Sequence, residues 1–231
     1  MRFLALFRKE FREALPWLIV AGALLLLLGG FVLQDQVNRA ARDPGRWHGG
    51  SPRQMRIYSF IQESRLAAVG SLLLMISAAL GLVLGGRQFW MPGFTRTWAF
   101  TLHRSVGPRT VLWAKLAATA AAFAVSLGLL WTLMFLYASR PGVLAYQPRV
   151  RVFVEGWIYV LLGLLVYLGA ALSGLSGARW YTTRLVPLAV ALLMGIWALA
   201  QASLGATFAI VGAAAVVLGV QVVHLFGSRE Y

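Results

Sequence analysis

Six long runs of apolar residues, none with a charged side chain in its interior, dominate the sequence. A helix needs about 20 mostly apolar residues to cross the hydrocarbon core of a bilayer. Runs this apolar exclude a transmembrane barrel, whose strands alternate apolar and polar residues. The sequence therefore predicts an all-α integral membrane protein of one domain, residues 1–231, with six transmembrane helices. The expected spans are 17–33, 66–84, 116–138, 157–176, 185–204 and 206–225.

The composition supports this class of protein. Hydrophobic residues make up 60% of the chain and charged residues only 12%. The balance of 21 Lys and Arg against 7 Asp and Glu could suggest nucleic-acid binding, but these charges flank the apolar runs. We therefore expect membrane lipids, and no nucleic acid, as partners. The absence of cysteine excludes disulfides, thiolate metal sites and a cysteine nucleophile.

Orientation follows from the connecting segments. The last two runs meet at Leu204-Gly205-Ala206, which predicts a tight uncharged turn and a helical hairpin. The distribution of Lys and Arg favours an N-terminus inside the cell, with both lysines, Lys9 and Lys115, on that side. Both termini are then cytoplasmic, and we expect the inner membrane of a bacterium.

Motifs for catalysis are missing from the sequence. It contains no G-x-x-x-x-G-K-[ST] phosphate loop, and its three histidines are far apart. The run Gly174–Ala178 lacks the last glycine of a nucleophile elbow and favours helix packing. All seven acidic residues fall outside the expected spans, so no buried carboxylate marks a proton or cation relay, and ion-coupled transport loses support. The sequence thus predicts neither an enzyme nor a bound cofactor or metal.

The first 15 residues form an amphipathic pattern. Phe3, Phe7 and Phe11 recur at four-residue steps, while Arg8 and Lys9 face away. This pattern predicts an interfacial helix over residues 1–15, with its apolar face in the acyl boundary. Such a helix can simply anchor the N-terminus inside, or it can act as an elbow that transmits motion from a cytoplasmic partner.

The connection between the second and third spans, residues 85–118, is patterned as well. Trp98 and Leu102 lie at a helical step, and Gly107-Pro108 breaks any helix before the chain resumes toward the third span. We expect a short cytoplasmic helix followed by a turn.

The stretch TWAFTLHRSVGPRTVLWAKLAA resembles the cytoplasmic loop of ABC-transporter permeases of the type 2 exporter class. In that loop a Thr-Trp-x-Phe-Leu-Leu-like segment precedes a turn, and a Lys-Leu pair opens the third span. Gly107-Pro108 stands here in place of a Ser-Arg pair. The outline of the resemblance also takes in the N-terminal segment, the six spans and the closing FGSREY. The matching positions are Thr97, Trp98, Phe100, Leu102, Arg104, Val106, Arg109, Lys115 and Leu116.

The resemblance implies a permease whose loop docks as a coupling helix on a separate ATPase subunit, which would hold the ATP and magnesium. It also implies pairing with a second copy, as a homodimer, or with a related permease. The residues that would contact the ATPase are Thr97, Trp98, Phe100, Leu102, Arg104 and Arg109.

Two further features have open interpretations. Two helix faces carry small residues four positions apart, Gly81-x-x-x-Gly85 and Ala215-x-x-x-Gly219. Such faces let helices approach closely, either within one subunit, which we favour, or across a dimer. The strongly basic outer loop, residues 34–65, could bind an anionic substrate or an accessory protein, but arginines beside a bilayer readily find lipid phosphates. We favour a solvated loop.

Two other functions compete with the permease. A non-transporting membrane scaffold would share the spans but would need no structured loop at 94–109. A membrane transferase or hydrolase would require convergent polar groups at one depth, which the expected spans lack.

Overall fold

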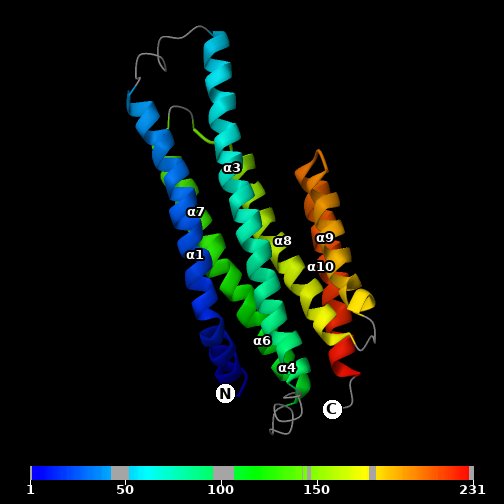
Figure 1. Ribbon diagram of the computed structural model, residues 1–231. Coiled ribbons are helices and arrows are strands. Elements are labelled where there is room, and N and C mark those ends of the chain that lie inside the picture. The colour runs from blue at the N-terminus through cyan, green and yellow to red at the C-terminus, as the bar shows by residue number, and fades with distance from the viewer. Residues whose placement is uncertain are drawn as a thin grey trace.

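A computed structural model describes residues 2–42, 52–95, 107–141, 143–144, 147–176 and 181–228. This part of the chain forms an elongated bundle of helices (Figure 1). The prediction of an all-α fold is confirmed for it, and five of its helical segments are long and apolar enough to cross a membrane. The elements are α1 Arg2–Arg42, α3 Pro52–Gly85, the π-helix η1 Gly86–Trp90, α4 Met91–Phe94, α6 Pro108–Phe123, the π-helix η2 Ala124–Gly128, α7 Leu129–Ala138, α8 Val150–Leu175, α9 Tyr181–Leu199 and α10 Leu204–Gly227.

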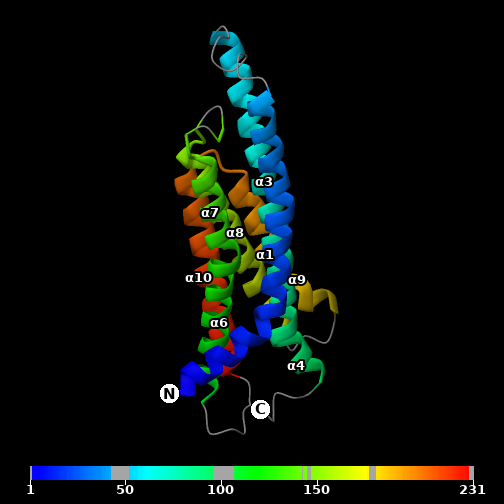
Figure 2. The same cartoon turned by 90° about the vertical axis from the view of Figure 1, so that its left-hand side faces the viewer.

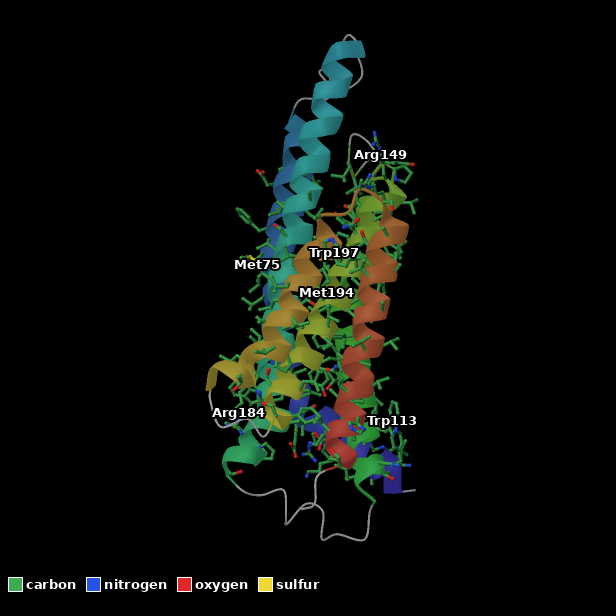
Figure 3. All side chains as sticks on the ribbon, turned by 90° about the vertical axis from the view of Figure 1, so that its right-hand side faces the viewer. Met75, Trp113, Arg149, Arg184, Met194 and Trp197 are labelled. Atoms are coloured by element: carbon green, nitrogen blue, oxygen red, sulfur yellow. The ribbon has the colours of Figure 1, made fainter. Side chains whose placement is uncertain are left out.

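The start of α1 and the end of α10 lie at the same end of the bundle, together with α4 and the start of α6 (Figures 1 and 2). We call it the termini end. The turn between α9 and α10 lies toward the opposite, far end. In Figure 3, Trp113 marks the termini end and Arg149 marks the far end.

Helices α1 and α3 are much longer than the predicted spans. The 41 residues of α1 correspond to about 60 Å, twice the thickness of a hydrocarbon core. At the far end both helices extend beyond the rest of the bundle (Figure 1). The prediction of a loop over 34–65 is therefore wrong for 34–42 and 52–65, which are helical. Residues 34–42 contain neither Gly nor Pro, so nothing in them ends the helix when the apolar run stops.

The N-terminal segment is continuous with the first span. Pro16 lies inside α1 instead of separating two helices. Its ring leaves the carbonyl of Arg12 without a helical donor, which bends a helix without ending it. Figure 2 shows the first turns of α1 at an angle to the remainder.

Helix α8 is the centre of the bundle and packs against α3, α9 and α10. Glycines permit the closest approach, since a Cβ on Gly81 would lie 2.3 Å from the carbonyl oxygen of Gly163. Ser77 Oγ, on α3, donates a hydrogen bond to the carbonyl of Tyr159 at 3.0 Å. The favoured interpretation of Gly81-x-x-x-Gly85 is thus confirmed, because this face packs inside the subunit.

The last two helices form the predicted hairpin, but its turn lies earlier than expected. Helix α9 ends at Leu199 and α10 begins at Leu204. The side chain of Ser203 caps α10 by accepting a hydrogen bond from the Ala206 amide at 3.2 Å. The prediction of a turn at Leu204-Gly205-Ala206 is wrong because a capping serine outweighs a glycine that α10 can hold in its first turn.

Candidate functional site

A buried ion pair joins α1 to α6 at the termini end. Lys115 Nζ, on α6, donates to Glu10 Oε1, on α1, at 2.8 Å. The side chains are only 9% and 8% exposed. Glu10 lies outside the six expected spans, and the sequence did not predict its burial. Each charge has lost its contact with water, and its attraction to the other offsets that cost. Removing either side chain leaves the other charge buried and unpaired.

The position of Glu10 follows from the helical period of α1. The buried side chains Leu25, Ala21, Leu18 and Ala14 form one stripe along the helix. Continued toward the N-terminus by another four residues, this stripe reaches Glu10. A carboxylate at an apolar register position can be buried only beside a cation, and Lys115 supplies it.

A second, more exposed pair lies next to the first. Arg87, in η1, places Nη2 3.8 Å from Glu13 Oε2 and donates to the backbone carbonyl of Glu13. That carbonyl lies in the turn disturbed by Pro16, where helical donors are missing or displaced. Arg87 therefore fastens the bent start of α1 to the π-helix. A polar cavity of about 250 Å³ opens between these residues, with Lys9 and Lys115 also on its wall.

A separate hydrogen-bonded cluster lies next to the ion pair, and its Gln88 lines the same cavity as Glu10 and Lys115. Tyr167, on α8, donates its hydroxyl to Gln88 Oε1 at 2.6 Å. Thr119, one turn along α6 from Lys115, places Oγ1 3.3 Å from Gln88 Nε2. All three side chains are buried. A polar network this deep is stabilising only when its members satisfy one another, so its geometry specifies how the helices meet.

The π-helix η1 is what brings Gln88 into the bundle. A π turn holds one extra residue and shifts the phase of the residues that follow, and such turns are frequent at functional sites. Within η1 the consecutive residues Gln88 and Phe89 are both buried. Trp90 donates its indole N–H to the carbonyl of Ala170 at 2.8 Å, which fixes η1 against α8.

We call the set Glu10, Glu13, Arg87, Gln88, Lys115, Thr119 and Tyr167 the polar network. It ties together α1, η1, α6 and α8. Its chemistry is that of ion pairs and hydrogen bonds which can break and re-form as helices move. Within the described residues no group of three metal-ligating side chains occurs.

Gly174 and Ser176 lie at the end of α8. A Cβ on Gly174 would lie 2.3 Å from Trp90 Cδ1, so this glycine is a packing contact, as the sequence favoured. Ser176 donates its hydroxyl to the carbonyl of Ser173.

The predicted site residues fall into three groups. The contact positions Thr97, Trp98, Phe100, Leu102 and Arg104 lie outside the described residues. Of the N-terminal aromatics, Phe3 is exposed, while Phe7 and Phe11 are half-buried and stack with ring centroids 6.0 Å apart. Arg109 is exposed and lines a groove between α6 and α10.

Sequence reasoning missed most of the polar network. Lys115 was identified as a cytoplasmic lysine and as part of the Lys-Leu pair that opens the third span, and not as a partner of Glu10. Glu10 had a usable signal in the apolar stripe of α1. Gln88 had none, because its orientation depends on the π turn. Tyr167 is one of three aromatic residues in the apolar run 157–176, and nothing in the sequence distinguishes it.

Comparisons with known proteins give no relative: no protein-family model, no curated protein and no solved structure matches the chain.

Proposed function

We propose that the chain is the membrane-spanning permease subunit of an ATP-driven exporter. A separate ATPase subunit, carrying the ATP and magnesium, would bind the segment between α4 and α6. The sequence of that segment, with Trp98, Phe100 and Arg104, supports this role through its resemblance to exporter permeases.

One structural observation carries the proposal. Helix α6 begins directly after the loop, and its second turn holds Lys115 in the buried pair with Glu10. A displacement of the loop would pull on α6 and hence on the start of α1. The same helix reaches Gln88 through Thr119. The polar network is therefore suited to pass a movement from a cytoplasmic partner to four helices of the membrane domain.

The proposal includes six membrane crossings. The described apolar part of α9, Thr183–Leu199, has 17 residues, at the lower limit for a span. The chain must nevertheless return from the end of α8, at the termini end, to the start of α10 (Figure 1). Helix α9 makes that return, corresponds to the fifth predicted span, 185–204, and brings the number of crossings to six. The bent start of α1 would serve as the elbow, with exposed Phe3 in the lipid interface.

The termini end is assigned to the cytoplasm of a bacterial cell. Both lysines lie there, Lys9 beside Glu13 and Lys115 beside Glu10. Cations are enriched on the cytoplasmic side of membrane proteins. A second copy of the chain, or a related permease, would complete the translocation path. A non-transporting scaffold is the competing function, and it would not need the loop.

Co-purification from the native membrane tests the proposal. The tagged chain should retain an ATPase that carries a phosphate loop. Trp98→Ala should weaken that association about thirtyfold, or about 2 kcal/mol, as expected for an aromatic interface hot spot. Trp197→Ala is the matched control, because Trp197 is 55% exposed midway along the bundle (Figure 3). Equal retention of the ATPase by both variants, or the absence of any ATPase, would favour the scaffold.

A further inference from the structure

An open groove runs between α6 and α10 from the termini end into the bundle. Its volume is about 750 Å³. Arg109 and His224 lie at its mouth, and Ala215, Gly219 and Val220 are among its walls. From Ser228 back to Ala215 it extends about 20 Å along α10, at 1.5 Å per residue. That depth corresponds to a headgroup and the acyl region of one leaflet, since the whole hydrocarbon core is about 30 Å thick.

The mouth of the groove is cationic. Arg109 is exposed and has no carboxylate partner in the described part of the chain, and no described residue of the lining is acidic. The start of α6 adds the positive end of its helix dipole. Trp113, 55% exposed on the next turn, lies beside α10 at the depth where indoles favour the membrane interface (Figure 3).

The walls are mostly apolar, and Gly219 leaves open space between the side chains of α10. A Cβ built on Gly219 would meet no atom within 4 Å, although Gly219 belongs to the small-residue pair Ala215-x-x-x-Gly219. Val216 and Val220 are 65% and 63% exposed on either side of it. Gly219 therefore makes no close approach to another helix within the subunit, in contrast to Gly81 and Gly85, although Ala215 packs against the core.

We propose that this groove binds an anionic phospholipid, with its phosphate at Arg109 and His224 and an acyl chain along Gly219. Basic recesses between membrane helices suit anionic headgroups. A second copy of the chain fits less well, because a twofold interface centred on this groove would bring two Arg109 side chains together. The inference requires that the bundle lie in a membrane, and does not depend on coupling to an ATPase.

Native mass spectrometry of the purified protein tests this site. The protein is titrated with phosphatidylglycerol or with phosphatidylcholine of the same acyl chains. We expect a bound lipid with a preference for phosphatidylglycerol. Arg109→Gln should lower that preference about fivefold, equivalent to about 1 kcal/mol for one interfacial cation. Gly219→Leu, which fills the groove, should remove the bound lipid.

Two control variants keep the test specific. Arg140→Gln removes an exposed cation that is not part of the groove, and Gly212→Leu adds the same side chain to α10 two turns from Gly219. Gly212 also has open space around it and does not line the groove. Both controls should bind lipid as the wild type does. Equal binding of the two lipids, or retention by Gly219→Leu, would overturn the proposal. A third outcome would also overturn it. If the Gly219→Leu protein became a monomer while the wild type is a dimer, with lipid binding unchanged, the groove would be assigned to a second copy of the chain.

Discussion

The pair formed by Glu10 and Lys115 is the residue-scale feature with the greatest consequence. Buried ion pairs contribute little net stability, because desolvation offsets most of their attraction. Their geometry is nevertheless strict: the pair closes only when α1 and α6 lie in one relative position. A pair of this kind is therefore better suited to defining a conformation than to stabilising a fold.

Removing one partner should be far more damaging than removing both. Lys115→Met leaves Glu10 buried and unpaired, which should cost about 3–5 kcal/mol of folding free energy. Glu10→Leu combined with Lys115→Met should return the stability to within about 1 kcal/mol of wild type, since an apolar pair can replace a buried ion pair. Thermal unfolding of the purified protein in detergent measures these differences. A double variant as unstable as Lys115→Met would show that the two residues do not act as a pair.

At the scale of elements, the sequence predicted what depends on local pattern. Apolar run length located the helices, and Gly107-Pro108 correctly marked the start of α6 at Pro108. Prediction from sequence failed where tertiary contacts or helix caps determine the end of a helix or the orientation of a side chain. The hairpin turn was misplaced because Ser203 caps α10, and the outer loop was misjudged because residues 34–42 continue α1. No local pattern indicates the π turn that orients Gln88.

The close packing of α3 on α8 gives a test at this scale. Gly81→Ala places a methyl group 2.3 Å from the carbonyl oxygen of Gly163, a backbone atom that cannot rotate away. Overpacking of this kind should cost about 1–3 kcal/mol. Gly212→Ala, on the open face of α10, should leave the melting temperature unchanged or raise it slightly. Equal melting temperatures for the two variants would contradict the close approach of α3 and α8.

At the scale of the whole molecule, the proposed topology rests on two observations. The start of α1 and the end of α10 lie at the same end of the bundle, and α9 returns the chain from α8 to α10 (Figure 2). Native cysteine is absent, so single cysteines report on each end without interference. Gln147→Cys and Ala202→Cys should react with an impermeant thiol reagent added outside the cell. Thr95→Cys and Ser228→Cys should react only after the membrane is opened. Outside labelling of position 95 alone would invert the proposed orientation, and outside labelling of both 95 and 202 would show that α9 does not cross the membrane.

ATP turnover in liposomes tests the coupling function most directly. The measurement compares three samples at equal permease levels where a permease is present. They are the ATPase with the wild-type chain, the ATPase with the double variant Trp98→Ala, Arg104→Glu, and the ATPase alone. If the loop before α6 couples the two subunits, the wild-type complex should turn over ATP faster than the isolated ATPase. The double variant should insert normally and fall to the rate of the ATPase alone. Equal turnover by both complexes, with undiminished co-purification, would contradict a coupling role for this loop.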